Sequence, residues 1–440
     1  MGKLLNTKLF ALAVLALILI FAVSQVEWKV HERRATHDSV VQTIAEQYAH
    51  AQQLVGPLLW IKCSEPSNLI ETDSNGSRRQ VVSHDCSQVI RPDSLTGQGR
   101  LEVAERYRGI YRAHIYTAAL QLQAVMPAFT PKPGQVIEAA ELIFGVADPR
   151  GIKQVRIVTA DGDELAARPG VSGGPSKFGF HVPLTPADLD QVQRLTLDLE
   201  VAGSARLDLV PVAANNDFSL QSSWPHPSFA GLYLPETREV GHDGFNARWR
   251  VSDFATGGDQ VLTNYARNAE QPEHWLSESF GVSLLDPVDA YTQTDRAVRY
   301  GFLFVLLTLG GFFLFEMIKR KSVHPLQYLL IGFAVVLFFL LLLALSEHIA
   351  FSLAYVVTAS ACVLLITAYG RTLLGHWLGA GVLGVGYALL YAGLFMLLAS
   401  EDYALLMGVW LIFGLLALTM WLTRKLDWRS LGRAAEDEAA

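Results

Sequence analysis

Residues 328–345 read YLLIGFAVVLFFLLLLAL, a stretch of eighteen residues without a charged side chain. A helix needs about 20 mostly apolar residues to cross ~30 Å of hydrocarbon, because every backbone hydrogen bond must close inside the helix. Five further stretches meet this requirement, one near the N-terminus and four in the C-terminal third. We therefore expect six transmembrane helices, at roughly 9–26, 298–318, 328–345, 349–369, 378–398 and 403–422.

Lysine and arginine residues beside these stretches predict their orientation, because short loops rich in them stay on the cytoplasmic side. The turns at 346–348 and 400–402 contain neither residue. The opposite ends of the helices carry Lys3, Lys8, Lys319, Arg320, Lys321, Arg371, Arg424, Lys425 and Arg429. Both termini are therefore expected in the cytoplasm, with residues 27–297 outside it.

The first apolar stretch has two interpretations. Small residues at Ala22 and Ser24 are typical of a signal-peptide cleavage site, after which the helix is lost. We favour a retained anchor, because the apolar run is longer than most signal-peptide cores and the next residues keep a helical spacing of apolar side chains.

The long segment 27–297 is acidic, with 24 Lys and Arg against 34 Asp and Glu, or a net charge of −10. The whole chain carries −7, which argues against a nucleic acid as partner because phosphate binding needs clustered basic residues. The apolar stretches instead predict the lipid bilayer as partner.

From about Leu58, apolar and polar residues alternate, with Gly or Pro between the runs. This pattern predicts several short strands in a β-rich fold resembling an antiparallel sandwich. The expected organisation is a transmembrane anchor (1–26), a helical stalk (27–57), a periplasmic β-rich domain (58–297), a five-helix transmembrane bundle (298–422) and a cytoplasmic tail (423–440).

Cys63 and Cys86 flank a polar loop in the segment expected outside the cytoplasm. An oxidising compartment permits a disulfide between them, and two free thiols are the alternative. The third cysteine, Cys362, lies within an apolar stretch, where it is expected to be a small packing residue.

The sequence also resembles a known family. The segments that carry the resemblance are FGVSLLDPVDAY at 280–291, HPLQY at 324–328, SEH at 346–348, DPRGI at 148–152 and SFAGLYLP at 228–235. Together they resemble the CreD family of bacterial inner-membrane proteins. The resemblance implies an envelope-integrity protein whose expression depends on a carbon- and envelope-responsive two-component system, in a family without an agreed enzymatic activity.

Two acidic turns are candidate binding positions. Glu347-His348 and Glu401-Asp402 occur at the same point of two helical hairpins. A structural interpretation is that these carboxylates stabilise the start of the following helix through its dipole. The alternative is a cation or proton site, formed if the two turns meet, with the identity of any metal left open.

Asp286, Asp289 and Arg296 lie where the β-rich domain joins the second helix. They are expected to form a salt-bridged junction, and a functional alternative is that the junction transmits a change in the domain to the bundle.

Catalytic motifs are scarce in the sequence. It has no H-E-x-x-H, no Walker A and no C-x-x-C pair, and the G-x-S-x-G match around Ser172 lies between two prolines instead of a strand and a helix. We therefore predict no catalytic residue and no cofactor.

The predicted function is a non-enzymatic membrane protein that binds envelope proteins or cell-wall components, in an oligomeric state that the sequence leaves open. A transporter and a periplasmic hydrolase are the alternatives. The transporter is weakened by the lack of charges at the centres of the apolar stretches.

Overall fold

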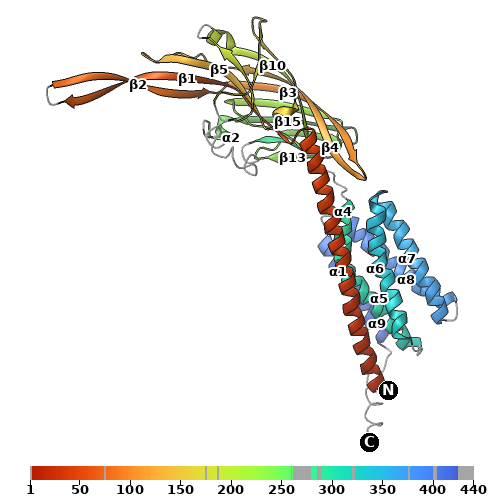
Figure 1. Ribbon diagram of the computed structural model, residues 1–440. Coiled ribbons are helices and arrows are strands. Elements are labelled where there is room, and N and C mark those ends of the chain that lie inside the picture. Colours follow the sequence, from red (N-terminus) through yellow and green to blue (C-terminus); the bar gives the residue numbers. More distant parts are fainter. Residues whose placement is uncertain are drawn as a thin grey trace. The chain divides into compact units, whose positions relative to one another are not determined.

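The computed structural model divides the chain into two compact units (Figure 1). One comprises Met1–Asp38 with Val288–Ala440 and is called the helical unit below; the other, Ser39–Pro287, is called the β unit. The residues described are 2–73, 76–173, 176–185, 188–258, 260, 279–284, 290–319, 323–374, 377–399 and 404–424.

The helical unit contains the first part of α1 and a group of helices from the C-terminal third. Their bounds are α1 (Gly2–Gln47), α4 (Ala290–Arg299), α5 (Gly301–Lys319), α6 (Pro325–Ser346), α7 (Phe351–Leu374), α8 (Trp377–Ala399) and α9 (Ala404–Thr423). The helix α1 packs closely on α6 and on the start of α5, because glycines face it there. A Cβ atom on Gly332 would lie 2.1 Å from Leu19, and one on Gly301 would lie 2.6 Å from Val23. Such small residues allow close helix contact in a lipid environment.

Four helices among the described residues are long and apolar enough to cross a membrane: Phe10–Gln47, Pro325–Ser346, Phe351–Thr372 and Trp377–Leu398. A fifth span results if Ala290–Arg299 and Gly301–Phe313, which are bent by 44° relative to each other, count as one. A membrane protein with several spanning helices is therefore what the structure supports.

The described residues of the β unit form two eight-stranded sheets. The first has the order β13 (Pro227–Gly231), β16 (Phe280–Leu284), β11 (Arg206–Leu209), β1 (Gln52–Asp73), β5 (Val136–Val146), β9 (Gly179–Leu184) and β8 (Arg168–Pro169), with β2 (Gly76–Ile90) paired to β1. The second has the order β14 (Thr237–Gly241), β15 (Gly244–Ser252), β12 (Asn215–Ser222), β3 (Ser94–Arg108), β4 (Tyr111–Val125), β10 (Arg194–Ser204), β6 (Ile152–Thr159) and β7 (Glu164–Leu165). Short helices between the strands include η1 (Pro149–Gly151), η2 (Asp188–Gln193) and α2 (Asp253–Thr256).

One extended apolar core includes residues of both sheets. On β15, for example, Phe245 and Trp249 are buried while Asn246 and Arg248 are exposed, as expected for a strand with one face on the core and the other in solvent. Gly97 on β3 makes room for this packing, because a Cβ atom there would lie 2.5 Å from the ring of Phe218.

The sequence predicted antiparallel sheets, but both sheets contain a parallel pair of strands as well. The strand β1 pairs in parallel with β11, and β3 pairs in parallel with β12. The other strand pairs of the described residues are antiparallel. Parallel partners lie far apart in the sequence, at Gln52–Leu54 with Leu207–Leu209 in the first case. The alternation of side chains within a strand is the same in both arrangements, so the sequence pattern does not distinguish them.

The helix and strand boundaries also differ from the expected ones. The helix α1 ends at Gln47 and β1 begins at Gln52, so the helical stalk does not reach residue 57. The apolar pair Leu54-Val55 fits either a helix or a strand, and pairing with β11 and β5 makes it a strand. Residues 290–297, expected in the β-rich domain, belong to the helix α4.

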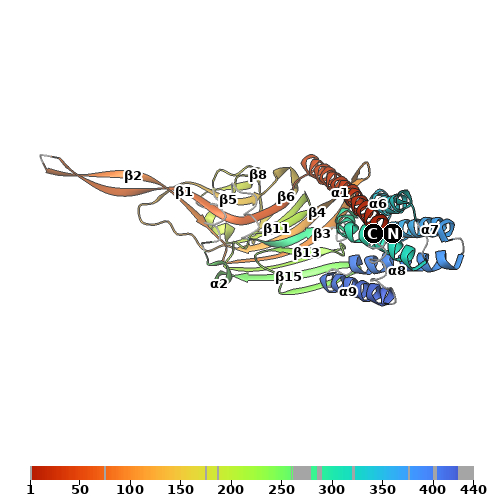
Figure 2. The ribbon, with the colours of Figure 1, turned by 90° about the horizontal axis from the view of Figure 1, so that it is seen from below.

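The strands β1 and β2 form a long hairpin that projects from the rest of the β unit (Figures 1 and 2). Cys63 and Cys86 face each other on the two strands and are joined by a disulfide, with Cα atoms 4.9 Å apart. Antiparallel pairing with β5 ends at Ser64, next to this disulfide.

Candidate functional site

A polar groove runs over the exposed face of the second sheet of the β unit. It has a volume of about 780 Å³. It is lined by Thr96, Gly97, Gln98, Gly99, Gln121, Gln123, Asp217, Ser219, Leu220, Gln221, Thr237, Arg238, Glu239, Asn246 and Arg248. The strands β3, β4, β12, β14 and β15 contribute these residues, so the groove floor is a rigid sheet surface.

Five amide side chains line the groove, and two of them are hydrogen-bonded to each other. The Nε2 atom of Gln98 donates to Oε1 of Gln121 at 2.8 Å, and Nε2 of Gln121 donates to Oδ1 of Asp198 at 3.0 Å. Each amide offers two donors and an acceptor, so this face suits a ligand with both kinds of group, such as a peptide backbone or sugar hydroxyls.

Charge in the groove is balanced by an ion pair. Arg248 donates from Nε and Nη2 to the two carboxylate oxygens of Asp217, at 2.7 and 2.6 Å. These hydrogen bonds lower the pKa of Asp217, which therefore stays ionised at neutral pH. Besides amides, the lining contains hydroxyl, carboxylate and guanidinium groups, so it offers both hydrogen-bond donors and acceptors.

The turn after α6 holds the first predicted candidates, Glu347 and His348. The carboxylate of Glu347 accepts a hydrogen bond from the Tyr291 hydroxyl at 3.2 Å and lies 3.6 Å from Nε of Arg33. Glu347 thus connects three parts of the helical unit, α1, α4 and α6, while His348 is exposed. These partners could not be predicted from the sequence, because they lie far from Glu347 in the chain.

Of the other five positions predicted from the two acidic turns and the junction, the structure describes only Arg296. Glu401, Asp402, Asp286 and Asp289 lie outside the described residues. Arg296 lies in the last turn of α4 and is partly buried. The cation or proton site at the two acidic turns and the salt-bridged junction therefore stay predictions.

The G-x-S-x-G match does not form a nucleophile elbow in the described residues. Ser172 lies in a bend, and the described residues on either side lead to the strands β8 and β9. A nucleophile elbow requires a strand followed by a helix.

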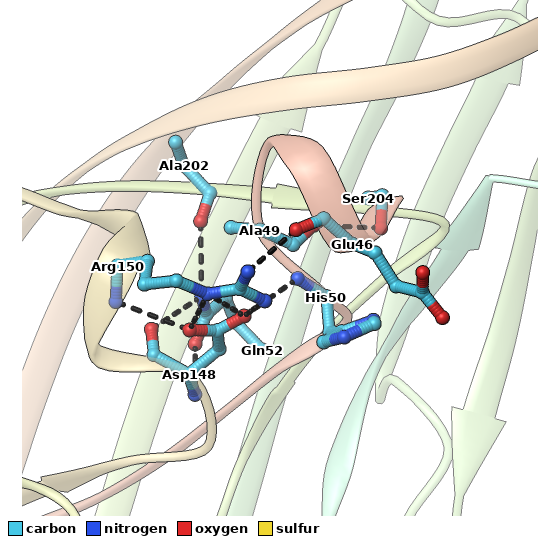
Figure 3. Close-up of polar contacts among 8 residues, drawn as sticks. All are labelled: Glu46, Ala49, His50, Gln52, Asp148, Arg150, Ala202 and Ser204. Atoms are coloured by element: carbon cyan, nitrogen blue, oxygen red, sulfur yellow. Dashed lines mark hydrogen bonds and ion pairs between the residues drawn. The ribbon is translucent and has the colours of Figure 1, made fainter. Parts of the chain in front are cut away.

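A second polar cluster, which was not predicted from the sequence, surrounds Asp148 (Figure 3). It fixes the chain where α1 ends and β1 begins. Arg150 donates to the Glu46 carbonyl at 2.5 Å and from Nε to Asp148 Oδ1 at 2.9 Å. Asp148 Oδ2 also accepts from the backbone N–H of His50 at 3.0 Å. The Asp-Pro-Arg-Gly sequence, typical of a capped turn, was the available signal.

Buried groups complete this cluster, which we call the Asp148 cluster. Gln52 donates to the carbonyls of Asp148 and Ala202 at 2.9 and 3.0 Å, and Ser204 donates to the Ala49 carbonyl at 2.8 Å (Figure 3). Burial alone raises the pKa of Asp148, but the hydrogen bonds from Arg150 and His50 outweigh it and lower the pKa to about 2.

Several apolar helices of spanning length, joined in one chain to a large β-rich unit that carries a polar groove, define a membrane protein of two units. The profile of the family described as "Inner membrane protein CreD" matches residues 4–429. The chain belongs to the CreD family.

A curated relative agrees with this assignment. The chain is 33% identical over 435 residues to "Inner membrane protein CreD" of Escherichia coli (strain K12), covering 96% of this chain and 92% of that protein. The bacterial inner membrane is therefore its location.

Proposed function

We propose that the chain is a non-enzymatic protein that supports cell-envelope integrity and the response to envelope stress, as part of a two-component regulon. In this proposal the groove of the β unit binds an envelope protein or a cell-wall component. The groove is the observation that carries the proposal. Its amide-rich lining can pair with the many donors and acceptors of a peptide or a glycan.

The proposed topology has six spans, both termini in the cytoplasm and the β unit in the periplasm. The distribution of Lys and Arg along the sequence supports this orientation. The sixth span is α9, which has 20 residues without a charged side chain. The disulfide between Cys63 and Cys86 fits a periplasmic location, where the compartment is oxidising.

Crosslinking in cells tests the binding role. A photoreactive amino acid is placed at Gln121 and, separately, at Gln221, both in the groove. The matched control position is Val136, which is 61% exposed on the other sheet. We expect the groove positions to capture the same envelope protein or cell-wall fragment and the control position to capture none.

A functional test uses a strain that lacks the gene. A variant with Gln98→Ala, Gln121→Ala and Gln221→Ala is expected to fold and reach the membrane but not to restore envelope resistance. The proposal is contradicted if this variant fully restores envelope resistance and the control position Val136 captures the same envelope component as the groove positions do.

The periplasmic location is tested separately. A cysteine introduced at the exposed Phe254 is expected to react with a membrane-impermeant reagent added to intact cells.

A further inference from the structure

Three potential metal ligands meet inside the helical unit, apart from the groove and from Glu347. Glu27 and His31 lie one turn apart on α1, so their side chains share a face of the helix. Asp295 lies on α4. One ligand atom from each residue lies within 4.8 Å of the others, and Nε2 of His31 is 3.6 Å from Oδ1 of Asp295.

The carboxylate of Asp295 gives an independent indication of a ligand. Asp295 is only 2% exposed, and its Oδ1 atom is buried without a hydrogen-bond partner among the described residues. A buried carboxylate oxygen without a partner is unfavourable, so such an atom points to a bound group. The other oxygen, Oδ2, accepts a hydrogen bond from Nε of Arg299 at 3.1 Å, which leaves Oδ1 directed toward His31.

We propose that Glu27, His31 and Asp295 bind a divalent cation of the zinc class. Imidazole nitrogen and carboxylate oxygen are common ligands of Zn²⁺, and two carboxylates supply the charge that a divalent cation needs. Three protein ligands leave a coordination position for water. Arg299 has the role of an outer partner, because it holds the Asp295 carboxylate in one orientation.

The position of the site suggests its consequence. Glu27 directly follows the apolar run that ends at Val26, and α4 directly precedes α5. A cation bound to all three ligands therefore links the N-terminal helix to the start of the C-terminal helices. The site is independent of the groove, so either proposal can fail without the other.

Zinc binding to the full-length protein in lipid nanodiscs tests this site, with Zn²⁺ alone as the probe. We expect one Zn²⁺ per chain by calorimetric titration and by elemental analysis. His31→Gln and Glu27→Gln are expected to weaken binding by at least about tenfold each, because loss of even an outer partner costs about 10- to 100-fold in metal affinity. Glu27 and His31 are both in contact with solvent, so replacing them is expected to disturb the fold less than replacing the buried Asp295.

The matched control is His242→Gln, which removes an exposed histidine of the β unit. It is expected to bind Zn²⁺ as the unaltered protein does. Absorption bands of bound Co²⁺ give a second readout, expected to be lost in His31→Gln and kept in His242→Gln. The proposal is overturned if the unaltered protein binds no Zn²⁺, if His31→Gln binds it equally well, or if His242→Gln loses binding to the same extent.

Discussion

Replacing Asp148 with asparagine is expected to destabilise the β unit at neutral pH. Hydrogen bonds from Arg150 and His50 lower the pKa of Asp148 from 3.8 to about 2. At about 1.36 kcal/mol for each pH unit, this corresponds to about 2.4 kcal/mol, and partial exposure of Arg150 reduces the expected loss to about 2 kcal/mol. An acid with a lowered pKa stabilises the fold above its unfolded-state pKa. We therefore expect the stabilisation to be complete above about pH 5 and to disappear as the pH falls toward 2.

Hydrogen–deuterium exchange of the full-length protein in nanodiscs measures this effect. Amides of β1 and β10 next to the cluster are expected to exchange about 30-fold faster in Asp148→Asn at pH 7, the ratio that about 2 kcal/mol represents. The control is Asp161→Asn, the same chemical change at an exposed turn, which is expected to leave exchange unaltered. Equal protection in Asp148→Asn and the unaltered protein would refute the assigned role of the cluster.

Three further predictions concern other parts of the chain. Replacing Cys63 and Cys86 with alanine is expected to lower the stability of the hairpin by about 3 kcal/mol, measured by amide exchange in residues 59–90, because the disulfide closes a loop with a separation of 23 residues. Glu316→Gln leaves its ion-pair partner Lys8 uncompensated and is expected to lower the thermal stability of the helical unit, while removing both charges restores it. Burial raises the pKa of Asp208 to about 6 despite its Arg206 partner. The free energy of unfolding of the β unit is therefore expected to rise by up to about 3 kcal/mol as the pH falls from 7.5 to 4. Asp208→Asn is expected to remove this rise, as measured by thermal unfolding at a series of pH values.

Local patterns predicted much of the fold, because hydropathy and alternation are properties of neighbouring residues. The apolar run at 328–345 corresponds to α6, whose first turn is also encoded locally. His324 accepts a hydrogen bond from the Leu326 N–H at 3.2 Å, and Pro325 suits the first helical position. The start of β1 was not predictable in this way, because Leu54 becomes part of a strand only through a partner about 150 residues away.

The sites depended still more on contacts between distant residues. The spacing of Glu27 and His31 is visible in the sequence, but their approach to Asp295 requires the packing of α1 beside α4. The Gln98 and Gln121 side chains of the groove resemble any exposed positions of two strands until the pairing of β3 and β4 brings them together. In both cases the missing information was which strands or helices are neighbours.

The disulfide of the β1–β2 hairpin also determines the register of the two strands. Beyond Ser64, β1 has only β2 as a partner among the described residues, so neither a third strand nor the core of the sheet holds the alignment there. A slip of one residue would move Cys63 away from Cys86, which their covalent bond prevents. The pairing of residues 64–73 with 76–85 is thereby fixed from its base, and the hairpin keeps a single alignment where it projects from the rest of the β unit.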